Sequence, residues 1–317
     1  MKAIGGYFEL ETLRRGEYHK DAIKLNTGRN CLEYILRARK YEKVYIPYYT
    51  CEVILEPLQK TGTEYAFYSI DSNLELSQLV EIHDGEALLY TNYYGLKQHY
   101  VERLLSVYGK HLIVDNTQAF FAPPLAGIDT FYTCRKFFGV PDGAYLYTDA
   151  TLDAELEQDV SYERMSSLVK RIDLGPEAGY GDFREASHQL IGQPMKRMSR
   201  LTECLMESVG YEESAERRRA NYLHLHESLA GTNLIHLDLE RDAVPMVYPY
   251  HAVNGPALRE RLIANRVFVA RYWPNVLEWA AEGSVEHGLV SDLLPLPVDQ
   301  RYGLAEMDIL LGILRTS

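Results

Sequence analysis

The chain has 317 residues, of which 46% are hydrophobic and 25% are charged. This length corresponds to about two domains, and the composition excludes a disordered, collagen-like or coiled-coil chain. The formal net charge is −12, from 33 lysines and arginines against 45 aspartates and glutamates. So acidic a chain repels nucleic-acid backbones, whereas a small anionic ligand needs only a local cluster of donors.

Neither a membrane span nor a secretory signal is expected. The longest mostly apolar stretches, such as 88–94 and 307–314, are far shorter than the ~20 residues of a membrane span. The first twenty residues contain no apolar stretch and carry acids early. The sequence therefore predicts a cytoplasmic protein without a membrane partner, whose four separated cysteines are reduced thiols.

The first half of the chain alternates between helical and strand-like patterns. Helices are expected over 29–40, 52–60 and 97–108. Short apolar runs typical of strands cover 43–47, 65–70, 87–94, 111–115, 130–133 and 144–147. Strands that alternate with helices predict an α/β fold with a mainly parallel central sheet flanked by helices.

The pattern changes after about residue 150. Residues 155–191 are charged and poorly periodic, and one long helix is expected over 197–229. Strand-like runs follow at 247–251 and 267–272, with helices over 255–265 and 304–314. This α+β pattern predicts a smaller C-terminal domain, so that the chain divides into residues 1–205 and 206–317.

Asp115 ends an apolar run, His-Leu-Ile-Val-Asp, and Gln118 follows three residues later. A parallel strand would deliver Asp115 to the carboxyl edge of the sheet, where ligand sites of open α/β sheets lie. The alternative is a strand-end carboxylate that only caps a turn.

Lys136 follows another apolar run, in the segment Thr133-Cys-Arg-Lys-Phe. A partly desolvated amine there would have a lowered pKa and could form a Schiff base. The alternative is an ordinary surface lysine in a loop.

The segment Thr27-Gly-Arg-Asn30 stands directly before a predicted helix. Free backbone amides and the positive end of the helix dipole favour phosphate binding there, although a plain helix cap has the same sequence. The order of the three signals is what an enzyme dependent on pyridoxal 5′-phosphate (PLP), with the aspartate aminotransferase fold, requires. No metal site is expected.

Several segments resemble the DegT/DnrJ-type family of PLP-dependent sugar aminotransferases, over most of the chain. Leu25-Asn-Thr-Gly-Arg-Asn-Cys-Leu32 is similar to the family's phosphate turn, and Val114-Asp-Asn-Thr-Gln-Ala119 is similar to its Glu-Asp-x-Ala-Gln motif. Ile46-Pro-Tyr-Tyr-Thr-Cys51, the stretch 131–143 with its lysine, and Pro295-Leu-Pro297 add to the likeness. The resemblance implies PLP-dependent transferase fold type I with a small C-terminal α+β domain.

The resemblance also implies roles for single residues. Lys136 would form the Schiff base, Asp115 would contact the pyridinium nitrogen, and Gln118 would contact the ring's phenolic oxygen. The phosphate would be held by the turn at Gly28, Arg29 and Asn30, together with Thr133. The residue that stacks on the ring falls on Cys51, a poor ring stack, so Tyr49, Tyr93 and Tyr94 are alternatives for that role. Candidates for binding substrate anions are Arg135, Arg197 and Arg271.

The function implied is transfer of an amino group, with glutamate as the expected donor, to a keto-sugar that is expected to be nucleotide-linked. The resemblance implies a homodimer, with Arg197 near the partner's site. Two alternatives stay open. A related PLP-dependent sugar dehydratase carries histidine in place of the lysine, which Lys136 disfavours. The second alternative is a non-catalytic or regulatory protein, since Met195 and Val276 replace residues typical of the family.

Overall fold

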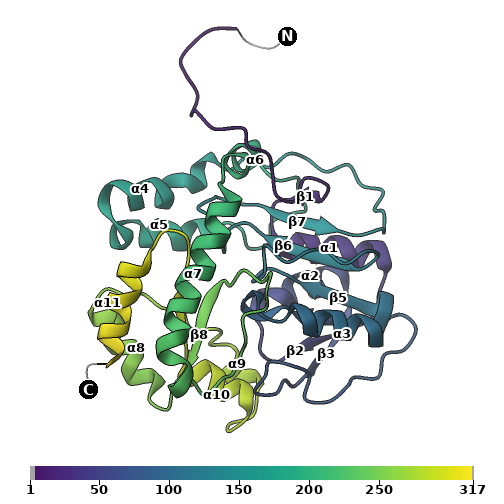
Figure 1. Ribbon diagram of the computed structural model, residues 1–317. Coiled ribbons are helices and arrows are strands. Elements are labelled where there is room, and N and C mark those ends of the chain that lie inside the picture. Colours follow the sequence, from purple (N-terminus) through teal and green to yellow (C-terminus); the bar gives the residue numbers. More distant parts are fainter. Residues whose placement is uncertain (1–3, 316–317) are drawn as a thin grey trace.

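A seven-stranded sheet forms the centre of the molecule in a computed structural model that describes residues 4–315 (Figure 1). Its strand order is β1-β7-β6-β5-β4-β2-β3. Pairing is parallel except at β7, which runs antiparallel to both neighbours. The strands are β1 (Ile23–Leu25), β2 (Lys43–Pro47), β3 (Glu64–Tyr68), β4 (Glu86–Thr91), β5 (Leu112–Asp115), β6 (Asp129–Thr133) and β7 (Ala144–Tyr147). The predicted α/β class with a mainly parallel sheet is confirmed.

Alternate residues of the central strands enter two separate cores, because successive strand side chains point to opposite faces. Ala87 and Leu89 pack in a cluster with α1 (Gly28–Arg39) and α2 (Leu55–Thr61). Leu88 and Tyr90 pack on the other face, with α3 (Gln98–Tyr108) and the C-terminal elements. The sheet is therefore covered by helices on both faces.

The C-terminal part adds a two-stranded antiparallel sheet of β8 (Val247–His251) and β9 (Leu293–Pro297). Helices around it are α7 (Tyr211–Leu229), α8 (Gly255–Ala264), α9 (Val276–Trp279), α10 (Val285–Asp292) and α11 (Leu304–Arg315). The predicted boundary between residues 205 and 206 falls inside α6 (Arg200–Glu207), and one apolar cluster holds residues from both sides of it. The division into domains stays a prediction, and its outermost residues, 1–3 and 316–317, lie outside the described ones.

Two sequence-based expectations were wrong in this half, and one segment without a clear pattern proved helical. Residues 155–191, which are charged and poorly periodic, contain α4 (Ser166–Leu174) and α5 (Pro176–His188), which pack against each other. The long helix over 197–229 is two helices, because the chain turns at Val209-Gly210 between α6 and α7. The run 267–272 forms no strand, since β8 takes β9 as its partner.

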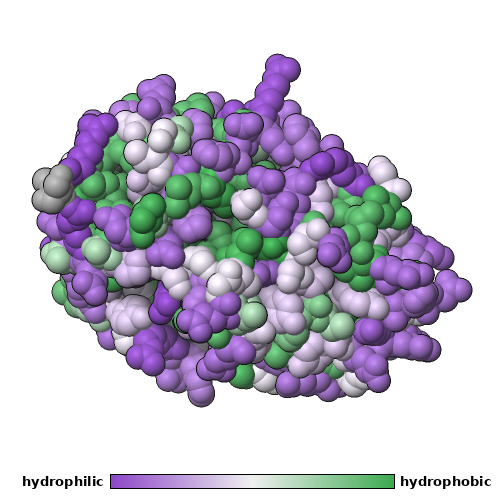
Figure 2. Space-filling view, turned by 90° about the horizontal axis from the view of Figure 1, so that it is seen from below, coloured by the Kyte–Doolittle hydropathy of each residue, from purple (hydrophilic) through white to green (hydrophobic). Residues whose placement is uncertain are grey.

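The surface fits an acidic globular protein. On the face in Figure 2, polar side chains predominate and apolar ones form separate patches. No helix within residues 4–315 is long and apolar enough to span a membrane.

Candidate active site

A cavity of about 830 Å³ lies at the carboxyl ends of the sheet strands. Thr91 ends β4, Asp115 ends β5 and Thr133 ends β6, and all three line the cavity. Gly28, at the start of α1, and Lys136, in the loop after β6, line it as well. The structure thus brings the three sequence signals into one cavity, at the edge where α/β sheets bind ligands.

Asp115 is 8% exposed and is held by its own turn. Its Oδ1 accepts a hydrogen bond from the backbone N–H of Thr117 at 2.8 Å, and Thr91 Oγ1 lies 3.5 Å from its Oδ2. No cation within residues 4–315 forms an ion pair with this carboxylate, which leaves its charge available to a ligand.

Lys136 donates a hydrogen bond from Nζ to Thr117 Oγ1 at 2.9 Å. Lys136 is exposed and lines the cavity, so a ligand there can reach its amine. Desolvation lowers the pKa of Lys136, and the nearby charges of Asp115 and Cys51 partly oppose this effect. A larger neutral fraction than that of an ordinary lysine makes this amine a better nucleophile and base.

Gln118 presents a donor without a partner. Its side chain is 1% exposed, and its Oε1 accepts a hydrogen bond from the backbone N–H of Tyr94 at 2.8 Å. That contact fixes the amide, and its Nε2 is buried with no partner among the described residues. Because an unpaired buried donor is costly, this amide is suited to an acceptor atom of a ligand in the cavity.

The start of α1 forms an anion site beside these residues. Thr27 caps the helix by accepting from the N–H of Asn30, and the preceding N–H groups of the first turn have no partner within the helix. A Cβ on Gly28 would lie 3.4 Å from Thr117 Cγ2, so a side chain there would fill space beside Thr117. Backbone amides at a helix start suit a phosphate.

The side chains of the two residues that follow Gly28, Arg29 and Asn30, have partners within the protein. The Arg29 guanidinium binds Glu56 at 2.9 Å and the Leu190 carbonyl at 2.8 Å, so its charge is already paired. Asn30 donates to Asn26 and to the Pro194 carbonyl and does not line the cavity. Arg29 lines the cavity with its charge already paired, so the free backbone N–H groups are the donors of this turn that remain available to an anion.

Of the three arginines predicted to bind substrate, only Arg135 lines the cavity. It donates to Ser187 Oγ at 3.1 Å, and no carboxylate among the described residues forms an ion pair with it. Desolvation, with the neighbouring charges of Arg164 and Arg29, lowers the pKa of Arg135 to about 10. Arg271 instead donates to the Val290 carbonyl, and Arg197 is exposed outside the cavity lining.

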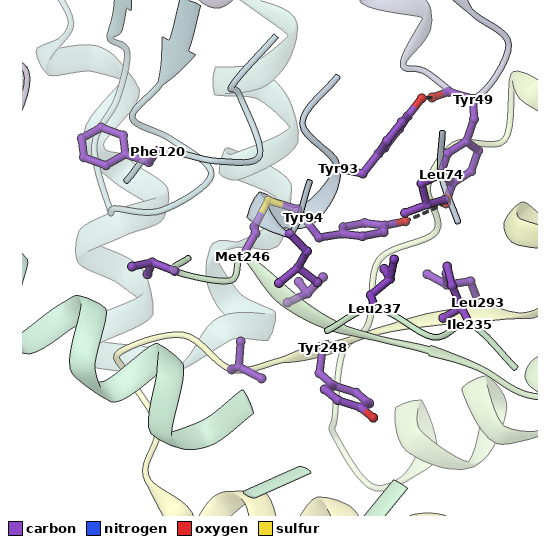
Figure 3. Close-up of a cluster of buried hydrophobic side chains, with 14 of the residues drawn as sticks. Tyr49, Leu74, Tyr93, Tyr94, Phe120, Ile235, Leu237, Met246, Tyr248 and Leu293 are labelled. Atoms are coloured by element: carbon purple, nitrogen blue, oxygen red, sulfur yellow. Dashed lines mark hydrogen bonds between the residues drawn. The ribbon is translucent and has the colours of Figure 1, made fainter. Parts of the chain in front are cut away.

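The three tyrosines offered as alternatives to Cys51 lie in the core, and the structure does not bring them to the cavity lining. The Tyr49 and Tyr94 hydroxyls are 2.8 Å apart, and Tyr93 donates to the Tyr49 carbonyl at 2.9 Å (Figure 3). Cys51 does line the cavity, and burial raises the pKa of its thiol.

Sequence reasoning missed Thr117, Trp273 and the wall formed by α5. Thr117 stands inside the Asp-Asn-Thr-Gln segment, so its position between Asp115 and Gln118 was available as a signal. The local sequence gives no signal for Trp273 or for the α5 residues Arg184, Ser187 and His188. They reach the cavity through packing between segments distant in the sequence, which the hydrophobic pattern does not show. No group of metal-binding side chains is found within residues 4–315.

Comparison with known proteins gives a likeness in structure alone, as neither a family model nor a curated protein sequence matches the chain. DesV of S. venezuelae, solved in complex with a ketimine intermediate, is 16% identical with a TM-score of 0.64, over 93% of this chain and 84% of that one. A DegT DnrJ EryC1 StrS aminotransferase from Brucella abortus is 16% identical, with a TM-score of 0.61, over 93% and 85%. The E. coli GDP-4-keto-6-deoxy-D-mannose-3-dehydratase with bound hydrated PLP is 15% identical, with a TM-score of 0.62, over 93% and 87%.

Sequence identity this low shows the fold and leaves the activity open. The likeness to DesV covers 93% of this chain. The chain therefore has the fold of PLP-dependent transferases of fold type I, as the sequence predicted.

Proposed function

We propose that this protein is a PLP-dependent aminotransferase that moves an amino group from an amino acid to a keto-sugar. One observation carries the proposal: the Lys136 amine, the free Asp115 carboxylate and the unpaired Gln118 amide line a single cavity. PLP chemistry requires each of these three groups separately. They also occur along the chain in the order that enzymes of the aspartate aminotransferase fold require.

The residues present fit the cofactor. Gln118 Nε2 offers a donor for the phenolic oxygen, and the first turn of α1 with Thr133 offers donors for the phosphate. Asp115 would face the ring nitrogen and favour its protonated form, since opposite charges stabilise each other. The cavity, at about 830 Å³, is within the range of sites for small molecules and cofactors.

PLP, when bound, supplies an electron sink for the electrons released at the substrate carbon. Lys136 would hold the cofactor covalently and, once released by an incoming amine, would carry the proton to and from the substrate carbon. Its lowered pKa suits this role, because a base must be neutral to accept a proton.

Arg135 supports an anionic substrate or cofactor group in the cavity. It lines the cavity, is half-buried and has no carboxylate partner among the described residues, so its charge is available to an anionic group there. A donor such as glutamate and a nucleotide-linked keto-sugar both carry anionic groups, and these two substrates complete the proposal. The protein would act in the cytoplasm on small molecules, without nucleic acid.

The test is amine transfer by purified protein loaded with PLP. Incubation with single amino acids should convert the bound cofactor to its aminated form, seen as loss of its visible absorbance, and glutamate is the expected donor. Added keto-sugars, free or nucleotide-linked, should restore the absorbance. Loss of a hydroxyl from the sugar to give a deoxy keto-sugar, with the nitrogen of the amino donor released as ammonia and no amino-sugar formed, would identify a dehydratase and overturn the aminotransferase assignment.

A homodimer is part of this proposal, supported by apolar side chains left exposed on one chain. Ile172 and Leu174 on α4 and Tyr180 on α5 are 84%, 67% and 61% exposed. The extended N-terminal arm, which projects from the body in Figure 1, carries Phe8 at 95% exposure. Large apolar side chains exposed on two helices that pack together, as on α4 and α5, typically mark a protein contact.

We expect sedimentation velocity to show a dimer at micromolar concentration, and Ile172→Glu to weaken it at least about tenfold by placing a charge in the contact. Val107→Glu, at an exposed position on α3, is the control and should leave the dimer intact. A wild-type chain that sediments as a monomer would exclude the dimer.

A further inference from the structure

Three aromatic side chains line the cavity among the described residues: Phe131, Phe183 and Trp273. Phe131 is 3% exposed and lies under the start of α1, where a Cβ on Gly28 would be 3.8 Å from its ring. Phe183 is on α5, with its ring 5.8 Å from the Arg135 guanidinium. Trp273 alone comes from the C-terminal part of the chain.

The turn that contains Cys51 holds the Trp273 segment in place. Asn275 Nδ2 donates to the Thr50 carbonyl at 3.0 Å, and Val276, which is fully buried, donates its N–H to the Trp273 carbonyl at 3.0 Å. Thr50 and Cys51 both line the cavity. Trp273 is therefore fixed next to the position that the sequence assigned to ring stacking.

Two aromatic neighbours support the indole of Trp273. Its ring lies 5.1 Å from that of Tyr49, centroid to centroid, and 5.3 Å from that of Tyr272. Trp273 is nevertheless only half-buried, and it lines the cavity. A tryptophan supported by a buried tyrosine loses little freedom when a flat ligand packs on it.

We propose that Trp273 is the aromatic side chain that covers the flat ring of the cofactor, the role that the small Cys51 and the core tyrosines leave open. This inference rests on the proposed PLP function. It assigns to the C-terminal part of the chain a direct share in cofactor binding. It also explains how a cavity with cysteine at the stacking position can still hold a conjugated ring.

Cofactor affinity of the full chain provides the first test. Trp273→Leu, which keeps apolar bulk, and Trp273→Ala should each weaken binding of PLP about tenfold, measured by titrating the absorbance of the bound cofactor. Pyridoxal, which has the ring but no phosphate, should be weakened by a similar factor. Trp279, which packs on Phe67 outside the cavity, supplies the control, and Trp279→Leu should leave both affinities unchanged.

Fluorescence gives a second readout that does not depend on activity, because the chain has only two tryptophans. In Trp279→Phe only Trp273 emits, and PLP should quench most of that emission. In Trp273→Phe only Trp279 emits, and the fractional quenching should be clearly smaller. Thermal unfolding of each variant establishes that it is folded before titration.

The outcomes separate the two proposals. A wild-type chain that forms no covalent PLP adduct contradicts the proposed function itself. A wild-type chain that binds PLP, while Trp273→Leu binds PLP and pyridoxal with unchanged affinity, overturns the inference about Trp273 alone. Equal fractional quenching of the two tryptophans would overturn it as well.

Discussion

Replacing Lys136 with alanine is expected to abolish amine transfer and leave the fold intact. The proposed chemistry needs an amine at this position, both to hold the cofactor and to move the proton, and alanine supplies neither. Within residues 4–315 the Lys136 side chain makes one hydrogen bond, to Thr117 Oγ1, and it is exposed, so little packing is lost. Turnover should fall by at least about 10³-fold, or about 4 kcal/mol of transition-state stabilisation.

The stability of this variant follows from the pKa of the lysine. Desolvation lowers the pKa of Lys136 in the folded chain below its ordinary value of 10.5. The unfolded chain then binds more protons between the two pKa values, so this lysine makes folding more favourable as pH rises through that window. Below it the charged amine opposes folding, and Lys136→Ala should unfold at the wild-type temperature or slightly above it at pH 7.

Chemical trapping identifies the lysine directly. Borohydride reduction of the PLP-loaded protein, followed by peptide mapping, should place the label on Lys136. Lys20→Ala is the control, because Lys20 is exposed and lies far from Lys136 in the sequence, and this variant should be labelled like the wild type. A label on another lysine would remove Lys136 from the site.

Local sequence patterns predicted the strands that build the site well. β2, β7 and β8 have the predicted bounds, because each is a short apolar run between polar turns, and β5 and β6 differ by one residue. Strand ends then position Asp115 and Thr133 without further information. This part of the site was within reach of sequence reasoning because it is set by parallel strands ending at one edge.

The walls of the cavity were not predictable in the same way. Gly175 and Pro176 separate α4 from α5, and glycines at 179 and 181 weaken the helical pattern of α5, so the helix that supplies Ser187 and His188 was missed. Trp273 comes directly after the run 267–272, which looks like a strand but has no strand to pair with. Both depend on packing between distant segments.

The tyrosines show a third limit. Tyr93 and Tyr94 follow β4 after one residue, Asn92, and a strand continued through them would send one of their side chains toward the site. Instead the chain turns there, with Tyr94 at φ 58°, and both rings enter the core. The turn still serves the site, because the N–H of Tyr94 fixes the amide of Gln118.

Asp115→Asn should leave the cofactor bound and reduce turnover by at least about a hundredfold, through kcat more than KM. Asparagine keeps the shape, and its Oδ1 can still accept from the N–H of Thr117, so the turn is preserved. The charge is lost, and with it the preference for a protonated ring, which matters most as negative charge develops in the transition state. A hundredfold loss corresponds to about 2.7 kcal/mol.

The same substitution should alter Lys136 in a direction that is separate from catalysis. The Asp115 charge raises the pKa of Lys136, in part compensating desolvation, so its removal lowers that pKa further. The rate at which PLP attaches to the protein depends on the neutral amine and rises with pH up to the pKa. We therefore expect the midpoint of this pH dependence to move to lower pH in Asp115→Asn, measured by the growth of the cofactor absorbance.

Glu185 is the matched control, since it is the other carboxylate among the described residues that line the cavity. Glu185→Gln removes the same charge from the α5 wall. It should change kcat by no more than about twofold and the pH midpoint by no more than a few tenths of a pH unit, because an exposed carboxylate is screened by solvent. If Asp115→Asn kept near-normal turnover and an unchanged midpoint, Asp115 would be only a strand-end carboxylate that caps its own turn. The ring nitrogen would then have to lie elsewhere in the cavity, away from the carboxyl end of β5.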